Sequence, residues 1–293
     1  MINTIMKKSG EKAYQKDLQR LDYSLLSSQI TEKLNISYIQ DNSPEHTLDV
    51  YYKDDGQSKP IFIDIHGGGF ISHDKEVNRL FGNYMAQKGF VVFNLNYKLA
   101  FPVYNVFDQI KDVADAVDFI LENACEYNGN LEKLYIAGHS SSGVLAVAEA
   151  LLCVSPKMRA DFNIPERSFK YSGVLLDCGL MHFYKKSIAY WGMRNMVFPT
   201  GYKNESRYKD LIFENNPDIS KLPKTVLLTN SKDELNAMTY HFKQVLSNYN
   251  VENKLIDKDS DGHMGIIFKP YTKENIRIID EITNFLGLPF SQI

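Results

Sequence analysis

The stretch LYIAGHSSSGVLAVAEALL, residues 134–152, joins two apolar segments across a short polar turn. The first segment is short and ends in Ala-Gly, as a buried strand can, whereas the part from residue 141 onward has the length and the Ala and Leu content of a buried helix. Three adjacent serines, Ser140, Ser141 and Ser142, occupy the junction. A strand that passes directly into a helix in this way indicates one step of a sheet with crossover helices.

The rest of the chain repeats this alternation of short and long apolar segments. Short β-branched and aromatic runs alternate with longer stretches of helical spacing, which is typical of an α/β fold with a mostly parallel sheet and helices on both faces. We predict eight strands, which begin at Ile36, Leu48, Lys59, Phe90, Lys133, Ser172, Thr225 and Val251. We predict helices over residues 78–88, 106–126, 141–152, 236–248 and 272–286.

Two segments do not fit the alternation. Residues 1–33 are polar and helix-permissive, and residues 180–217 interrupt the step from the sixth to the seventh strand with a segment rich in Tyr, Phe and Met that holds the only Trp. A connection of that length usually forms a lid, and its aromatic content argues against disorder. We therefore predict a single domain over residues 1–293, with cap elements at about 1–33 and 180–217.

Composition excludes several classes of function. The 293 residues are 44% hydrophobic, which is enough for a substantial core, and the net charge of −3 comes with interspersed lysines and acids rather than a basic block. We therefore expect a small-molecule partner, and neither nucleic acid nor a membrane. The three cysteines are widely spaced, and the N-terminus has no apolar signal region, so we expect free thiols and a cytoplasmic protein.

The serine turn fits a nucleophile elbow, in which a tight strand-to-helix turn lifts a serine hydroxyl above the sheet edge. Gly138 lies two residues before Ser140, but Ser142 stands where a second glycine is usual. If Ser141 were the nucleophile, Gly143 would supply the second glycine, but His139 would stand where the first glycine is usual. We therefore favour Ser140 as the nucleophile. Ser142 is then expected to replace a small turn residue and to tolerate substitution by glycine. A helix N-cap serine is the alternative that needs no chemistry.

A second motif lies upstream, in IFIDIHGGGF, residues 61–70, where a strand runs into three glycines. Bare backbone amides in such a loop can stabilise a developing oxyanion. We expect the amides of Gly68, Gly69 and Ser141 to form the oxyanion hole. An ordinary glycine turn is the alternative.

Two further residues complete the arrangement in chain order. Asp233 follows the seventh strand and His263 follows the eighth, so both belong at the carboxyl edge of the sheet, where sites in open α/β sheets gather. The order Ser, Asp, His is the one expected for this elbow, and we take these residues as a catalytic triad with Ser140. His66 is expected to brace the glycine loop and His139 to pack beside the elbow. The other histidines show no ligand spacing, so we expect no metal and no cofactor.

These motifs together resemble the α/β-hydrolase superfamily, in its esterase and lipase branch similar to hormone-sensitive lipase. HGGGF, NYKLAF, GHSSSG, KDEL and DGHMG stand in family order, and the resemblance covers roughly residues 36–290. NYKLAF departs from the family's YRLAPE segment at Lys98 and Phe101. The resemblance implies the α/β-hydrolase fold, places the nucleophile on Ser140 and leaves a homodimer open, since dimers are common among similar esterases.

The expected activity is hydrolysis of carboxylic esters of small, short-chain acyl groups through an acyl-enzyme. Phe70, Trp191 and Met264 are candidates for the substrate pocket. Two alternatives stay open because the triad does not encode the leaving group: an amide hydrolase similar to arylformamidases, and a non-catalytic ligand-binding member of the superfamily.

Overall fold

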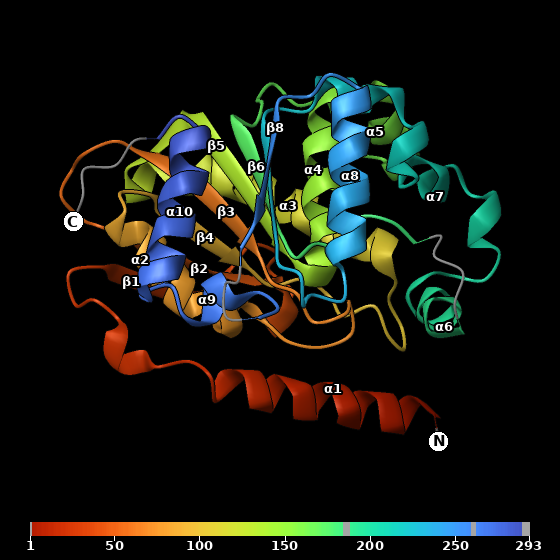
Figure 1. The fold of residues 1–293 in the computed structure, drawn as a ribbon, viewed down its shortest axis with the longest axis horizontal. Helices are drawn as coiled ribbons and strands as arrows, with labels where there is room; N and C mark the ends of the chain where they lie inside the picture. The colour runs from red at the N-terminus through yellow and green to blue at the C-terminus, as the bar shows by residue number, and fades with distance from the viewer. Residues whose placement is uncertain (1, 184–187, 259–261, 289–293) are drawn as a thin grey trace.

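The computed structural model describes residues 2–183, 188–258 and 262–288, and it contains one eight-stranded sheet with the order β1-β2-β4-β3-β5-β6-β7-β8 (Figure 1). β2 pairs antiparallel with β1 and β4, and every other neighbouring pair is parallel. The predicted mostly parallel sheet is confirmed. The strands are β1 (Thr31–Ser37), β2 (Thr47–Tyr52), β3 (Lys59–Ile65), β4 (Val91–Leu95), β5 (Gly129–His139), β6 (Gly173–Asp177), β7 (Thr225–Thr229) and β8 (Asn253–Asp257).

Helices cover both faces of this sheet. α2 (Arg79–Gln87) and α10 (Lys273–Phe285) pack on one face, while α3 (Val106–Asn123), α4 (Gly143–Val154) and α8 (Asn236–Asn248) pack on the other (Figure 1). Side chains of a strand alternate between the two faces, so Ile61 and Ile63 enter the core beside α4 whereas Phe62 enters the core beside α2. Because both faces are buried, β3 reads as a continuous apolar run around a single acid, Asp64.

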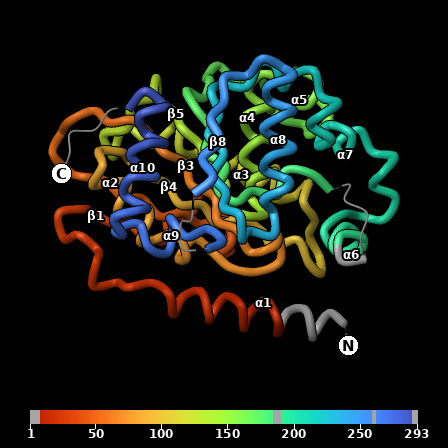
Figure 2. Tube along the Cα trace, viewed as in Figure 1, coloured from red at the N-terminus to blue at the C-terminus, as the bar shows by residue number. Residues whose placement is uncertain are grey.

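Further helical segments lie around these layers. α1 (Ile2–Leu18) runs along the outside of the layered core, and α6 (Ile188–Val197) lies toward the same lower side (Figures 1 and 2). The remaining helices are α5 (Pro156–Phe162), α7 (Ser206–Asp210) and α9 (Gly265–Phe268). Short 3₁₀ segments cover Tyr23–Leu25, Pro44–His46, Lys75–Asn78, Ala124–Tyr127, Ser140–Ser142, Tyr202–Asn204, Phe213–Asn215 and Pro217–Lys221.

The structure differs from the sequence prediction at the edge of the sheet. β1 begins at Thr31 rather than at Ile36, so residues 31–33, which we predicted as part of the first cap segment, pair with β2 instead. β1 is an edge strand whose side chains are half-buried or exposed, and such a strand carries no apolar pattern. α5 was also missed, although Ser155 caps it and Pro156 occupies its first turn, which are helix-start signals.

No single helix within the described residues has both the length and the apolar character needed to span a membrane. A bent pair, Ser140–Val154 with Pro156–Phe162, passes by length and composition alone.

Candidate active site

The turn after β5 holds Ser140 in an unusual backbone conformation. Its φ is 54°, in the left-handed region that residues with a side chain rarely adopt. Gly138 allows the turn to be this tight, since a Cβ at that position would lie 2.4 Å from the Ser142 carbonyl oxygen. Strained backbone of this kind persists at functional sites when the surroundings hold it in place. The turn therefore has the geometry predicted for a nucleophile elbow.

Two distant loops bring their side chains to this serine. His263 Nε2 lies 2.8 Å from Ser140 Oγ, and His263 Nδ1 lies 2.5 Å from Asp233 Oδ2. The second oxygen of Asp233 accepts the Leu235 amide at 2.7 Å, and this bond orients the carboxylate. The structure thus brings together the three side chains that the sequence nominated, as one hydrogen-bonded chain.

The electrostatics of the pair favour a charged imidazole. Burial lowers the pKa of His263, but the hydrogen bond and charge of Asp233 more than offset this, so the pKa lies above its ordinary value. Burial raises the pKa of Asp233, and the hydrogen bond and charge of His263 outweigh it, so the carboxyl pKa is lowered. An imidazolium that forms after proton transfer from Ser140 is therefore stabilised.

The glycine loop after β3 lines the same space. Gly68 has a φ of 113°, and a Cβ there would lie 2.0 Å from the Ser72 carbonyl oxygen, so only glycine fits. Within the described residues, the amides of Gly68 and Gly69 donate no hydrogen bond. The Phe70 amide donates to Ser141 Oγ at 3.2 Å, which ties the loop to the elbow. Unsatisfied amides beside a serine hydroxyl are suited to bind an anionic oxygen.

The segment that follows β4, together with α3, holds this loop in place. Tyr97 donates its hydroxyl to the His66 carbonyl at 2.7 Å and stacks on the His66 ring at 4.4 Å. Gln109 of α3 donates to the carbonyls of Phe70 and Lys98, both at 2.8 Å. His66 lies against Gly67, as expected for a bracing residue.

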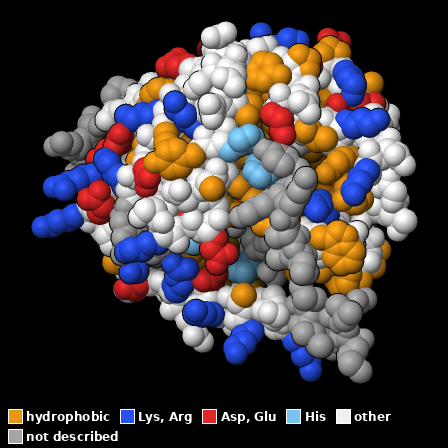
Figure 3. Space-filling view, turned by 45° about the vertical axis from the view of Figure 1, so that its right-hand side comes forward, with side chains coloured by type: hydrophobic (Ala, Val, Ile, Leu, Met, Phe, Trp, Pro, Cys, Tyr) orange, Lys and Arg blue, Asp and Glu red, His pale blue; other side chains and the backbone are white. Residues whose placement is uncertain are grey.

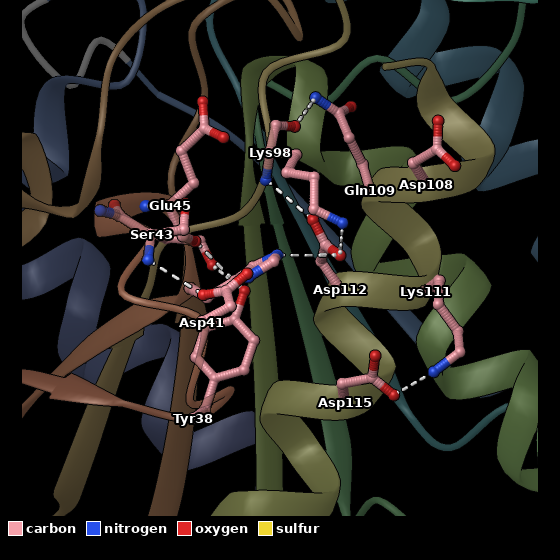
Figure 4. A network of polar contacts seen from close by, with 12 residues as sticks. Tyr38, Asp41, Ser43, Glu45, Lys98, Asp108, Gln109, Lys111, Asp112 and Asp115 are labelled. Carbon is pink, nitrogen blue, oxygen red and sulfur yellow. Dashed lines mark hydrogen bonds and ion pairs between the residues drawn. The ribbon is translucent and has the colours of Figure 1, made fainter. Parts of the chain in front are cut away.

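A polar network extends this brace to α3 (Figure 4). Asp112 accepts the backbone amide and the ammonium group of Lys98, each at 2.9 Å, and lies 3.4 Å from the His46 ring. Asp112 is buried, so the charge of Lys98 compensates a carboxylate that would otherwise be costly. The network fixes the loop that carries Lys98 and, through Gln109, the position of the glycine loop.

Comparison with known proteins adds a second line of evidence. The BD-FAE family model matches residues 48–192. A crystal structure of esterase B from Lactobacillus Rhamnosis superposes with a TM-score of 0.84 at 20% identity, over 98% of this chain and 94% of that one. A bacterial heroin esterase superposes with a TM-score of 0.74 at 17% identity, over 99% and 92% of the two chains. The chain has the α/β-hydrolase fold of these esterases.

Curated relatives match the chain over a shorter range. A probable isoprenylcysteine alpha-carbonyl methylesterase of Oryza sativa is 27% identical, over 46% of this chain and 31% of its own length. An acetyl esterase of Salmonella schwarzengrund is 32% identical, over 34% of this chain and 31% of its own length. The chain therefore matches only about a third of the length of these relatives.

A pocket of about 330 Å³ opens at Ser140. His263 and Met264 form one side, Gly68 and Gly69 another, and α1 contributes Ser9, Gly10, Ala13 and Asp17. Asp17 Oδ2 of α1 lies 3.1 Å from Nε2 of His73, which follows the glycine loop. This contact holds α1 over the pocket. The site is therefore roofed by the first of the two segments that we predicted as caps.

The pocket candidates from the sequence separate in the structure. Among the described residues, Met264 lines the pocket whereas Phe70 and Trp191 do not. Phe70 is fully buried and packs against Phe183, because the turn after the glycines points its ring into the core. Trp191 is 63% exposed on α6. Aromatic residue type alone does not distinguish a side chain that lines the pocket from one that packs in the core.

A second histidine cluster lies beneath the elbow, and its partners were missed. His139 is fully buried between Asp64 Oδ1 at 2.7 Å and Asp177 Oδ2 at 2.9 Å. Burial lowers its pKa, but the two carboxylates more than offset this and raise it to about 10. The signal was present, because a lone acid inside each of the apolar strands β3 and β6 needs a partner.

Ser142 has a larger role than the sequence indicated. Its buried hydroxyl accepts a hydrogen bond from the His139 amide at 2.7 Å and donates one to the Ile65 carbonyl at 2.6 Å. Ser142 is therefore more than a small turn residue, and glycine at this position would leave these buried groups without that partner. Whether the protein tolerates glycine there stays a prediction.

Charge at the surface is mixed. Among the described side chains on the face drawn in Figure 3, basic groups are interleaved with acidic and apolar ones and form no continuous basic patch.

Proposed function

We propose that this α/β-hydrolase is a serine esterase that cleaves carboxylic esters of small acyl groups through an acyl-enzyme. The observation that carries the proposal is the hydrogen-bonded chain from Asp233 through His263 to Ser140, beside amides that donate no hydrogen bond. The esterase names of the relatives and of the superposed structures support the reaction class.

The chemistry follows from the positions of these groups. Ser140 Oγ attacks the ester carbonyl while His263 Nε2 takes its proton, and the oxyanion is held by the amides of Gly68, Gly69 and Ser141. His263 then protonates the leaving alcohol as the carbon–oxygen bond breaks. A water molecule, deprotonated by the same nitrogen, hydrolyses the acyl-enzyme and restores Ser140.

The size of the pocket supports a small acyl group. The pocket at Ser140 has a volume of about 330 Å³. A neighbouring pocket of about 710 Å³ shares Ile71, Ser72 and His73 with it and is suited to a larger alcohol. The names of one superposed structure and one sequence relative fit this proposal: esterase B is described with a tributyrin phosphonate inhibitor, and the relative is an acetyl esterase.

A series of p-nitrophenyl esters tests the proposal. We expect kcat/KM to be highest for acetate to butyrate and to fall with longer chains, because they exceed the pocket. Ser140→Ala should abolish turnover and labelling by a fluorophosphonate probe, whereas Ser220→Ala, at an exposed serine, should change neither. Turnover of N-formylkynurenine far above that of every ester would instead favour the amide hydrolase, and the absence of labelling in the wild type would favour a binding protein.

A further inference from the structure

β6 ends beside the triad in a residue with strained backbone. Asp177 is the last residue of β6, and Cys178 follows it with a φ of 50°, in the left-handed region. Cys178 is fully buried, and its amide donates to the Leu228 carbonyl of β7 at 2.9 Å. A cysteine in this conformation requires that its surroundings hold it there, which directs attention to what its side chain contacts.

The Cys178 thiol lies beside the triad. The sulfur, a carboxylate oxygen of Asp233 and a ring nitrogen of His263 all lie within 4.8 Å of one another. Burial raises the pKa of the Cys178 thiol, so the group keeps its proton and acts as a donor.

A metal ion would be another use for these three donors, but the geometry opposes it. Nitrogen and oxygen ligands of a tetrahedral zinc ion lie about 3.3 Å apart. His263 Nδ1 and Asp233 Oδ2 lie only 2.5 Å apart, which is a hydrogen-bond distance. The cluster is therefore built for hydrogen bonding.

We propose that Cys178 is a positioning residue of the triad, whose thiol donates to Asp233 and so sets the orientation and basicity of its carboxylate toward His263. This inference rests on the proposed function. In this arrangement the thiol is a third donor to Asp233, beside the Leu235 amide and the His263 ring that already bind it. Each donor stabilises part of the negative charge of the carboxylate. The thiol therefore lowers the basicity of Asp233 and weakens its interaction with the His263 imidazolium.

Other charged groups face His263 and stay in place when the thiol is changed. Asp177 of β6 and Glu234 both raise its pKa, and across the pocket lie Asp17 of α1 and His73. Asp177 is itself bound to His139, so its charge is anchored below the elbow. These charged groups are the same in the Cys178 variants, so they do not account for a change in the titration of His263.

The test compares Cys178→Ala and Cys178→Ser with Cys153→Ala, a matched buried thiol at the far end of α4. Cys178→Ala should lower kcat by about tenfold with little change in KM, as expected when a charge-assisted hydrogen bond is lost. The acid limb of its kcat/KM profile should move to higher pH. Cys178→Ser keeps a donor and should restore both properties, and Cys153→Ala should change neither.

A titration of His263 by imidazole NMR separates this inference from the proposed function, because it needs no turnover. Its pKa should rise in Cys178→Ala and return in Cys178→Ser. An unchanged His263 titration in folded Cys178→Ala, or equal behaviour of the Ala and Ser variants, would overturn the role of the thiol. Absence of ester turnover in the wild type would overturn the proposed function, while the NMR titration would still decide the role of Cys178.

Discussion

The molecule contains two clusters in which a histidine meets aspartates, and they differ in burial. His263 is 39% exposed, binds one aspartate and touches a serine hydroxyl. His139, one residue before that serine, has no exposed surface and lies between two aspartates. The same residue types therefore serve two purposes. Access to solvent and a nitrogen that faces the Ser140 hydroxyl make His263 a proton acceptor. Full burial between two carboxylates keeps His139 charged at neutral pH, where it supports the elbow.

The largest difference should appear in activity. His263→Ala is expected to reduce kcat by about 10⁶-fold, because the serine loses its general base. The free energy of unfolding should change little, since the ring is partly exposed. Steady-state kinetics on p-nitrophenyl acetate and chemical denaturation measure the two properties. If His263→Ala kept most of the wild-type turnover, His263 would not be the general base, and the two histidines would not differ in the way described.

The converse is expected for the buried cluster. His139→Ala should lower the free energy of unfolding by about 3–5 kcal/mol, because Asp64 and Asp177 are left as buried, unpaired charges. His139→Leu combined with Asp64→Asn and Asp177→Asn should recover part of this loss, since it removes the charges as well. Urea denaturation with tryptophan fluorescence or circular dichroism checks both. Equal stability of the single and triple variants would contradict a charge-based role.

Stability should also depend on pH through His139. Its pKa in the folded protein is raised from 6.5 to about 10, so its contribution to stability is complete below pH 6.5 and is lost as the pH rises through about 10. The melting temperature should fall over this window in the wild type and fall less in the triple variant. Parallel curves for the two proteins would show that other groups carry the alkaline transition.

A smaller effect is expected at the residue that links the two clusters. Ser142→Gly should lower the free energy of unfolding by about 1–2 kcal/mol, because the His139 amide and the Ile65 carbonyl lose their buried partner. Ser155→Gly offers a comparison at a serine that caps α5 outside the elbow. If Ser142→Gly is as stable as the wild type, the hydrogen bonds of the Ser142 hydroxyl do not stabilise the fold.

The smallest effect concerns the pH dependence of activity. The pKa of His263 lies above 6.5, and its neutral form is the base, so kcat/KM should rise with pH through a midpoint above 6.5. Asp233→Asn removes the carboxylate that raises this pKa, so the midpoint of its residual activity should move to lower pH. A midpoint that does not respond to Asp233→Asn would assign the titration to another group.

Sequence reasoning succeeded where local pattern and chain order coincide. The apolar runs of β3, β4, β6 and β7 are evident in the sequence, because both faces of those strands are buried. Ser140, Asp233 and His263 were found because each follows a strand at the same sheet edge. Reasoning failed at β1, whose edge position removes the apolar signal, and at Phe70, whose ring turns into the core.

The sequence by itself determined the alternation of strands and helices, the elbow around Ser140 and the order of the three triad residues, since these depend on spacing along the chain. Only the tertiary structure decided which groups meet: α1 over the pocket, Asp64 and Asp177 on His139, and Cys178 on Asp233. Those contacts join residues far apart in the chain, and side-chain direction and burial set them, so no local periodicity encodes them.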